Sequence, residues 1–498
     1  MLRAIVGLLV SSFLLPGVHG RPQAQEPSQV ALGSNAVGEW LSSTIYAEDG
    51  VHFERVQHSH FPKHQLRITR PKLCDKQVEQ YSGYLDVADD KHLFFWFFEA
   101  RHDPENAPLM LWLNGGPGVS TIASGLLFEN GPCIFNTTSW RIEDRPLGWN
   151  EKVNIVYLDQ PAGTGYSYGA GTTTTLPGVA ADADAFLQLF LQRFPRYARL
   201  PLHIAGESFG GHFVPHIGAF VAAQNAGTST GRIPVRLASL VLANGLSEPA
   251  SQFATSADYL CGGGPYPPFA HDDRRCVAWR AATPPCVRMI ETCYAYENNA
   301  TCGAATAYCW PAVFTSPVEA VHAAGKNIHD LRAECEESAI PGNCYPQFDA
   351  ISEWLNQTST KRRLGVDQAL DFQFMKSDIQ QPFFTNGQAV LNSAALLVPL
   401  VNSGIRLLAF AGDADGVCNY MGIELWMRRL EHKHHAELAA VPPQPWVTST
   451  GYHAGEVTAA GKGAVAFVRV FEAGHMAPYD QPEATLELIS KWVDGEEL

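Results

Sequence analysis

The sequence predicts an α/β fold built on a central mixed sheet, with a disulfide-rich cap inserted over one edge of that sheet. Short apolar runs that end at glycine, proline or asparagine alternate with helical patterns, as in sheets covered on both faces. The alternation fades over residues 247–373, a segment that holds eight of the eleven cysteines. Such a segment buries little core of its own and needs cross-links, which indicates an inserted cap.

Length and composition are those of a globular protein with a sizeable core. The chain has 498 residues, of which 46% are hydrophobic and 17% are charged, which fits one large domain with an insertion or two to three smaller domains. We assign residues 51–246 and 374–498 to the core and residues 247–373 to the cap. The net charge of −15 argues against nucleic acid and anionic membrane surfaces as partners.

The beginning of the chain predicts export. Arg3 precedes an apolar run over residues 4–15, and residues 18–20 suit a cleavage site, so residues 1–20 are typical of a secretory signal peptide. Residues 21–50 are polar without clear periodicity and predict an N-terminal tail or a short pro-segment. No other stretch approaches ~20 apolar residues, and the polar C-terminus argues against a lipid anchor. We expect a protein that is secreted or delivered to a vacuolar or lysosome-like acidic compartment, without a membrane anchor.

The cysteines and sequons agree with export. Ten of the eleven cysteines could pair in an oxidising compartment, leaving one over. A zinc site is the competing interpretation and is disfavoured because no paired C-x-x-C motif is present, so we expect neither metal nor cofactor. The sequons at Asn136, Asn299 and Asn356 are compatible with glycosylation on exposed loops, or with chance.

The elements expected before residue 200 form the first half of the sheet. The second strand of an aromatic-rich hairpin is apolar nearly throughout, which predicts burial on both faces. Two further buried strands follow, and then a helix with aromatic residues at helical spacing. These elements are hairpin strands 80–87 and 93–99 with a turn at 89–91, strands 108–113 and 153–158, and helix 180–194.

A sharp turn between a strand and a helix presents Ser208. The apolar run 202–205 leads into GESFGG at residues 206–211, a G-x-S-x-G pattern. The glycines are needed because a side chain on either flank would collide with neighbouring backbone. The turn lifts the Ser208 hydroxyl out of the sheet and frees the Phe209 N–H to help hold an oxyanion. This short pattern indicates catalysis only if an Asp and a His follow at the ends of later strands.

Both residues follow in that order. Strand 405–411 runs into a loop with Asp415, and strand 466–471 runs into a loop with His475. The order Ser208, Asp415, His475 is that of the α/β-hydrolase fold. A serine hydroxyl needs an imidazole to accept its proton, and the imidazole needs a carboxylate to hold its tautomer and stabilise its charge.

Nearby residues offer alternatives to two members of this triad. Asp413 competes with Asp415, and His212 or His216 competes with His475. The two rival histidines lie on the helix after the elbow, from which a base cannot easily reach back, so we interpret them as packing or surface residues.

A glycine-rich loop follows strand 108–113. In the hydrolase layout a loop at this place supplies the second oxyanion donor from a backbone N–H, and residues 114–118, NGGPG, suit that role. The alternative is that the glycines and the proline merely make a turn.

Five segments of the chain together resemble the serine carboxypeptidases of the carboxypeptidase Y type. The resemblance extends from about residue 70 to the C-terminus. It implies an α/β-hydrolase fold with a cap inserted between Ser208 and Asp415, and removal of single residues from peptide C-termini through an acyl-enzyme. The segments are WLNGGPG at 112–118, DQPAGTGYSY at 159–168, GESFGGH at 206–212, GDADGVCN at 412–419 and AGHMAP at 473–478.

The resemblance also implies roles for individual residues. Ser208 is similar to the nucleophile, His475 to the general base and Asp415 to the carboxylate that orients it. The N–H groups of Gly116 and Phe209 are expected to form the oxyanion hole.

A second set of residues is implied to bind the free carboxylate of the peptide. These are Asn114, Gly115, Glu129 and Glu207, with Trp112 in support. Two facing carboxyls that share a proton have one pKa raised. A protonated Glu207 can donate a hydrogen bond to the substrate carboxylate, whereas an ionised one repels it, so binding should weaken as pH rises. The alternative for Glu207 is a solvated residue of the elbow.

Within this resemblance the cysteine spacings suggest four disulfide bonds in the cap. Val119 stands where many relatives carry a cysteine, which leaves Cys74 and Cys133 to pair with each other. Alternatively, either of these cysteines could pair with a cap cysteine, in which case the Cys335–Cys344 bond would not form. The suggested cap pairs are Cys286–Cys309, Cys293–Cys302, Cys261–Cys276 and Cys335–Cys344.

Cys418, three residues after Asp415, resembles the free thiol that the family has beside its substrate pocket. A buried structural cysteine is a compatible interpretation. Met476, next to His475, is expected near the same pocket.

Two other functions compete with peptide hydrolysis. In the first, the acyl-enzyme is intercepted by something other than water, or the substrate is an ester. The presence of Asn114, Glu129 and Glu207 favours peptides, because an ester without a carboxylate has no use for these groups. In the second, the protein binds a ligand on the same scaffold without catalysis. The complete set of Ser208, Asp415 and His475 argues against this function.

Overall fold

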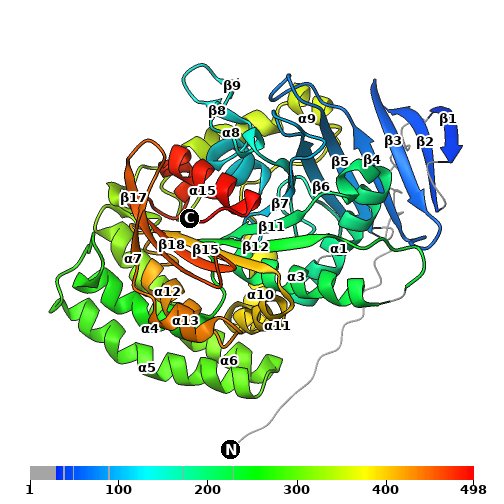
Figure 1. The fold of residues 1–498 in the computed structure, drawn as a ribbon. Helices are drawn as coiled ribbons and strands as arrows, with labels where there is room; N and C mark the ends of the chain where they lie inside the picture. The colour runs from blue at the N-terminus through cyan, green and yellow to red at the C-terminus, as the bar shows by residue number, and fades with distance from the viewer. Residues whose placement is uncertain (1–29, 37–39, 49, 88–89, 172, 228) are drawn as a thin grey trace, which may run out of the picture.

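A single twisted sheet runs through the whole molecule (Figure 1). The structure is a computed structural model that describes residues 30–498, apart from residues 37–39, 49, 88–89, 172 and 228. Its centre consists of parallel strands, and antiparallel strands extend the sheet on both sides. The predicted mixed sheet is therefore confirmed.

The sheet has fourteen strands among the described residues, in the order β1-β2-β3-β4-β5-β6-β10-β7-β11-β12-β15-β18-β17-β16. The strands from β10 to β18 in that order are parallel to one another. Their bounds are β1 Val30–Ala36, β2 Leu41–Glu48, β3 Val51–His58, β4 His64–Thr69, β5 Gln80–Val87, β6 His92–Phe98, β7 Leu109–Leu113, β10 Asn154–Leu158, β11 Leu202–Glu207, β12 Leu237–Ala243, β15 Arg406–Gly412, β16 Gln444–Val447, β17 His453–Ala460 and β18 Val465–Val470.

Helices cover both faces of the sheet, and successive strand residues point to opposite sides. On β12, Leu240 and Leu242 join one buried cluster with helices α1 and α3, whereas Val241 joins the other with α15. Outside the insertion the helices are α1 Leu176–Arg193, α2 Pro195–Ala198, α3 Gly210–Ala226, α11 Leu397–Ser403, α12 Tyr420–Arg429, α13 His435–Ala440, α14 Ala477–Asp480 and α15 Pro482–Asp494, with the short helices η1 Ile122–Glu129, η2 Trp149–Glu151, η5 Gln388–Val390 and η6 Ser393–Leu396.

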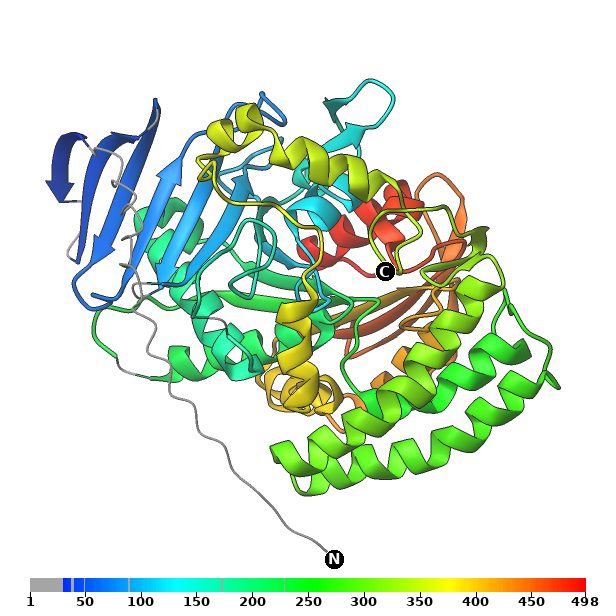
Figure 2. The same cartoon turned by 180° about the vertical axis from the view of Figure 1, so that it is seen from behind.

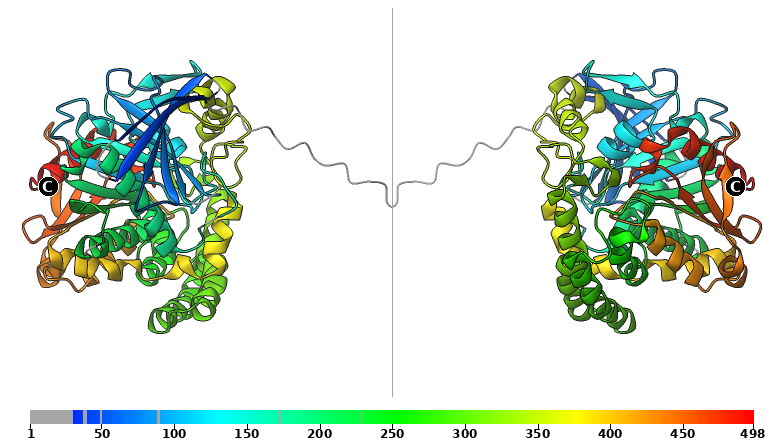
Figure 3. Two further views of the ribbon diagram at one scale, coloured as in Figure 1. Left: turned by 90° about the vertical axis from the view of Figure 1, so that its right-hand side faces the viewer. Right: turned by 90° about the vertical axis from the view of Figure 1, so that its left-hand side faces the viewer.

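The insertion between β12 and β15 lies along one side of this sheet. Seen from behind, it extends from α9, beside the N-terminal strands, to the long helix α5 (Figure 2), and the side views place it on the same flank of the molecule (Figure 3). Its elements are α4 Pro249–Asp258, η3 Tyr259–Gly263, α5 Arg274–Ala295, α6 Asn299–Cys309, η4 Trp310–Thr315, α7 Ser316–Ala323, β13 Lys326–Asn327, β14 Asp330–Glu334, α8 Gln347–Asn356 and α9 Thr358–Leu364, and helix α10 Ser377–Thr385 follows it.

The N-terminal segment contains two strands that its sequence did not indicate. Residues 30–36 and 41–48, assigned above to a tail or pro-segment, form strands β1 and β2 of the sheet. Strand β2 pairs along its whole length with β3, and the ring of Tyr46 stacks on Phe53 at 5.4 Å. Main-chain pairing at a sheet edge needs little apolar periodicity, so a polar segment can join it unnoticed. The expected signal peptide lies outside the described residues, as does part of the hairpin turn at 89–91.

All five disulfide bonds connect the cysteines that were expected to pair. Four lie in the cap, and the fifth joins Cys74 to Cys133. Cys418 is free and buried. Val119 forms an isolated antiparallel bridge with Met375, so main-chain contacts hold the loop after β7 at this point. Among the described residues no helix is long and apolar enough to cross a membrane.

Two short hairpins complete the described strands and helices. One is formed by β8 (Cys133–Asn136) and β9 (Arg141–Asp144), which follow η1. The other is formed by β13 and β14 inside the cap, and it reaches the active site described below.

Candidate active site

Ser208 occupies a strained turn between β11 and α3. Its φ of +59° lies in the left-handed region, which a residue with a Cβ rarely adopts. Glycines allow the turn to pack: a Cβ on Gly206 would lie 2.8 Å from Val214 Cγ2, and one on Gly210 would lie 3.0 Å from the Leu113 carbonyl. The G-x-S-x-G pattern therefore folds as a tight elbow with the serine at the start of a helix.

Asp415 and His475 meet at the ends of two neighbouring parallel strands, β15 and β18. The Nδ1 atom of His475 lies 2.7 Å from Asp415 Oδ2. Asp415 also accepts hydrogen bonds from the Asn244 side chain at 2.8 Å and from the Val417 N–H at 2.7 Å. Because Nδ1 is engaged in this way, Nε2 is the nitrogen left for the nucleophile.

The two groups shift each other's pKa. Burial by itself would raise the pKa of Asp415, but the neighbouring His475 and the donated hydrogen bonds hold it below its usual value. Burial would lower the pKa of His475, but the Asp415 carboxylate outweighs it, so this pKa is raised. Asp415 is fully buried, which makes its charge effective on the imidazole.

The rival residues lie elsewhere. Asp413 faces Arg469 at 3.5 Å and accepts the Glu472 N–H at 3.0 Å, and burial raises its pKa to about 6. His212 is buried with its Nδ1 2.7 Å from the Ser393 hydroxyl. Burial lowers the pKa of His212 to about 3 and that of His216 to about 4. None of these three side chains lines the cavity that contains Ser208.

Ser208 and His475 line one cavity of about 250 Å³ between the core and the cap. Among the described residues, no hydrogen bond joins the Ser208 hydroxyl to the imidazole. Catalytic hydrogen bonds of this kind often tighten only when substrate is bound. Cys418 and Met476 line the same cavity, and burial raises the pKa of the Cys418 thiol, which keeps it protonated.

The glycine-rich loop after β7 lies directly against the elbow. A Cβ on Gly115 would approach the Phe209 nitrogen to 2.3 Å, so only a glycine permits this contact. Gly116 adopts a φ of +102°, and its carbonyl accepts a hydrogen bond from Gln380 at 3.0 Å. Gly116 and Phe209 both line the cavity beside Ser208, where two backbone N–H groups can serve one oxyanion.

A chain of hydrogen bonds orients the carboxylate-binding candidates. The indole of Trp112 donates to Asn114 Oδ1 at 2.9 Å, which turns the amide nitrogen of Asn114 toward Glu129 Oε1 at 2.8 Å. The Ser124 hydroxyl donates to the same oxygen at 2.8 Å. Helix η1 carries Ser124 and Glu129, and a Cβ on Gly125 would lie 2.4 Å from the Trp112 nitrogen.

Glu207 completes this group from the elbow side. Its side chain is buried, and its pKa is raised well above the usual value by burial and then by the neighbouring Glu129 carboxyl. Oε2 of Glu207 and Oε2 of Glu129 are both buried without a hydrogen-bond partner among the described residues. Two buried carboxyls with unused oxygens next to a nucleophile can share a proton and receive an anionic ligand group.

The cap contributes residues that sequence reasoning missed. His329 lies 5.5 Å from His475, ring centroid to ring centroid, and lines the cavity with Tyr345, Trp310 and Phe314. No local pattern marks these side chains, because the fold of the insertion alone brings them to the core. Asn244, the second side-chain partner of Asp415, lies directly after strand β12. Its position at the end of a strand was the one feature of the sequence that could have indicated a place in the site.

A strained nucleophile elbow, a carboxylate-paired imidazole and a paired-glycine loop on an α/β sheet define a serine hydrolase of the α/β-hydrolase class. The model of the family described as serine carboxypeptidase matches residues 71–495. The chain belongs to the serine carboxypeptidase family and is accordingly a serine-type peptide hydrolase.

Individual proteins that are similar to this chain agree with the assignment to this family. A carboxypeptidase Y homolog A of Trichophyton rubrum is 35% identical over 487 residues, which are 97% of this chain and 86% of the relative. One of Ajellomyces dermatitidis is 38% identical over 424 residues, covering 84% of this chain and 74% of the relative. The crystal structure of Kex1(delta)p, a prohormone-processing carboxypeptidase from Saccharomyces cerevisiae, matches in fold with a TM-score of 0.69 at 20% identity, covering 85% of this chain and 94% of that one.

Proposed function

We propose that the chain releases single residues from the C-termini of peptides at acidic pH through an acyl-enzyme, with Ser208, His475 and Asp415 as the triad. The observation that supports this most is the carboxyl pair of Glu207, which lines the cavity with Ser208, and its neighbour Glu129, each with a buried oxygen that has no hydrogen-bond partner among the described residues. A free peptide terminus supplies the carboxylate that such a pair can bind.

The reaction takes two steps. Ser208 Oγ attacks the last peptide carbonyl while His475 Nε2 accepts the hydroxyl proton, and the N–H groups of Gly116 and Phe209 stabilise the oxyanion. The C–N bond then breaks, His475 donates its proton to the departing amine, and the peptide remains as an ester of Ser208. Water, deprotonated by His475, cleaves this ester and restores the serine hydroxyl.

The pH dependence follows from two opposed requirements. Glu207 must keep its proton to donate to the substrate carboxylate, so binding weakens as pH rises through its raised pKa. His475 must be neutral to act as a base, so activity falls as pH drops through the pKa of the imidazole. The raised pKa of His475 limits how far the optimum can move toward acid.

We place the enzyme on the export route, either secreted or in a vacuolar or lysosome-like compartment. The five disulfide bonds support an oxidising route. Of the three sequons, Asn299 is exposed at the start of α6 and Asn136 lies in the β8–β9 hairpin. The amide nitrogen of Asn356 donates to the carbonyls of Ser352 and Phe372, and a glycan there, which replaces one of its two hydrogens, would break one of these bonds. We therefore propose Asn136 and Asn299 as the glycosylated positions.

The test compares a blocked dipeptide with its C-terminal amide from acidic to neutral pH. Peptide hydrolysis predicts release of the free terminal residue, fastest at acidic pH, with the amide a much poorer substrate. Equal rates on both would favour an esterase or acyltransferase. No turnover, together with no labelling of Ser208 by a fluorophosphonate, would leave only a binding protein.

A further inference from the structure

The cavity beside Ser208 has two aromatic walls, supplied by different parts of the insertion and by Phe374, which directly follows it. One wall, here called the terminal wall, consists of Tyr345, Phe348 and Phe374. The other, the penultimate wall, consists of Phe253, Trp310 and Phe314, whose rings lie 4.5 to 6.4 Å apart. Ser208 and His475 line the same cavity.

Ring contacts place the terminal wall next to helix η1, which carries Glu129. Phe128, which precedes Glu129 on helix η1, lies 5.5 Å from Tyr345 and 4.6 Å from Phe348. The residue that leaves carries the free carboxylate, so its side chain must lie on this side of Ser208. The penultimate side chain then faces the other wall.

His329 stands between the terminal wall and the catalytic imidazole. Its ring centroid is 5.5 Å from that of His475 and 6.3 Å from that of Tyr345. Nδ1 is buried and has no hydrogen-bond partner among the described residues. Burial lowers the pKa of His329 to about 3, so the ring is neutral above that pH and carries one donor and one acceptor.

The other polar side chains on this side already have partners. Asn343 donates to the Ser338 hydroxyl at 3.0 Å and to the Tyr345 carbonyl at 2.8 Å. Ser124 donates to Glu129. The amide nitrogen of Asn343 and the hydroxyl of Ser124 are thus engaged, whereas Nδ1 of His329 has no hydrogen-bond partner among the described residues.

The hairpin that carries His329 is fastened to the catalytic loops by main-chain hydrogen bonds. The His475 N–H donates to the His329 carbonyl at 2.6 Å, the Gly416 N–H donates to Ile328 at 3.0 Å, and the Leu331 N–H donates to Ala414 at 2.9 Å. These bonds do not depend on the imidazole, so a substitution can remove the ring and keep its backbone in place.

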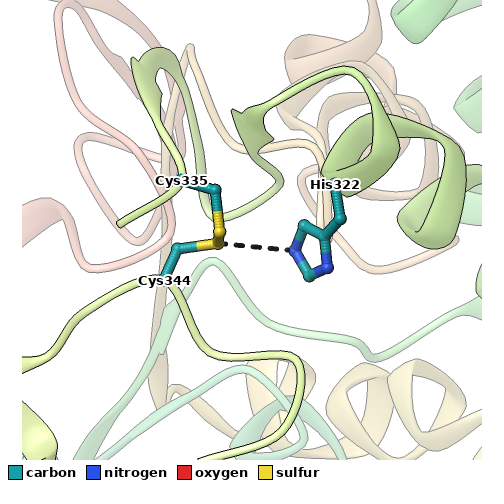
Figure 4. A group of neighbouring side chains, drawn as sticks. All are labelled: His322, Cys335 and Cys344. Atoms are coloured by element: carbon teal, nitrogen blue, oxygen red, sulfur yellow. Dashed lines mark hydrogen bonds between the residues drawn. A yellow bond between two sulfur atoms is a disulfide. The ribbon is translucent and has the colours of Figure 1, made fainter. Parts of the chain in front are cut away.

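The loop after the hairpin is also held. The Cys335–Cys344 disulfide closes it, with Cys344 Sγ 3.6 Å from His322 Nε2 (Figure 4). Cavity-lining residues 340–343 lie within this closed loop. The terminal side of the cavity is thus a fixed surface on which a single polar side chain can discriminate.

We propose that His329 determines which terminal residue is released, by forming a hydrogen bond with an uncharged polar side chain of the leaving residue. This inference rests on the proposed function. A leaving residue that can make the bond is favoured over an apolar residue of similar shape.

The experiment measures kcat/KM on blocked dipeptides that share a penultimate Phe and end in Thr or Val, Gln or Met, and Tyr or Phe. The three pairs place the polar group of the leaving residue at a short, a medium and a long distance from its backbone. We expect the polar member of at least one pair to be favoured about 3- to 10-fold, the range of one net hydrogen bond. His329→Phe should abolish that preference, and His329→Gln, which keeps a donor and an acceptor, should retain most of it.

Two controls isolate the effect. Dipeptides with a fixed terminal Phe and a penultimate Tyr or Phe should give the same ratio in wild type and in His329→Phe. Phe314→Leu, on the penultimate wall, should leave the preference between terminal residues unchanged.

The proposal is overturned if wild type prefers the polar member of no pair, a result that needs no variant. It is also overturned if active His329→Phe keeps the preference, or slows every substrate equally, because the ring would then act only in packing. Release of no terminal residue from any dipeptide would instead refute the proposed peptidase function.

Discussion

The core and the cap of this protein meet at one cavity but contribute different things to it. The core supplies Ser208, His475 and Asp415 from turns at the ends of parallel strands, where backbone geometry sets each position. The cap supplies side chains such as His329, Tyr345 and Trp310, which line the cavity. The contrast indicates that changes in the core should alter the rate on every substrate, whereas changes in the cap should alter which substrates are used.

The largest expected effect tests the core. Ser208→Ala removes the proposed nucleophile, and kcat should fall by about five to six orders of magnitude, as in other triad enzymes. The loss should be the same for every terminal residue. His212→Phe is a suitable comparison, because His212 is buried outside the cavity and should leave the rate within a few-fold. Substantial turnover in Ser208→Ala would show that another nucleophile acts.

The next effect tests the proposed binding of the substrate carboxylate by the core. Glu207→Ala should raise KM for peptides about 10- to 100-fold, the cost of a lost hydrogen bond to a charged group. Glu207→Gln donates at every pH, so the rise in KM with pH that we expect for the wild type should be reduced. The sign follows from the raised pKa of Glu207: wild type loses the donor as pH rises. A C-terminal amide substrate, which has no carboxylate, should be insensitive to either change.

A cap disulfide gives a smaller effect that should separate stability from rate. The Cys335–Cys344 bond closes a loop with a sequence separation of 9 residues. Replacing both cysteines by serine should lower the free energy of unfolding by about 2–3 kcal/mol, from the chain entropy of a loop of that length. KM should rise because residues 340–343 are no longer held. Thermal melting measures the change in stability, and the rate of fluorophosphonate labelling measures the reactivity of Ser208. Slower labelling would contradict the separation of stability from rate.

The smallest effect sharpens the comparison within the cap. Phe314→Ala removes one ring of the penultimate wall and enlarges the cavity there. The preference for penultimate Phe over Ala should fall by about 3- to 10-fold in kcat/KM, because the penultimate Phe loses part of its apolar contact area and keeps the rest. The preference between terminal Phe and Ala should stay constant. Equal loss at both positions would mean that the two walls do not act independently.

Several features were predictable because their signals are local. The elbow around Ser208 needs glycines at neighbouring positions, and the strands around it are apolar on both faces, so sequence periodicity and turn chemistry located them. The fold class, the cap and the pairing of its cysteines were predicted from pattern, spacing and resemblance. Strands β1 and β2 escaped because pairing at a sheet edge relies on main-chain hydrogen bonds, which leave little trace in side-chain order.

The sequence by itself therefore determined the fold class, the order of serine, aspartate and histidine, and the family, since each depends on short segments whose residue types are dictated by local geometry. Only the tertiary structure decided which of two aspartates faces the imidazole, with Asp415 2.7 Å from His475 and Asp413 turned to Arg469. It also brought His329 and the aromatic walls to the cavity. Such contacts join residues far apart in the chain, and their positions follow from how the insertion packs on the sheet, which no local pattern records.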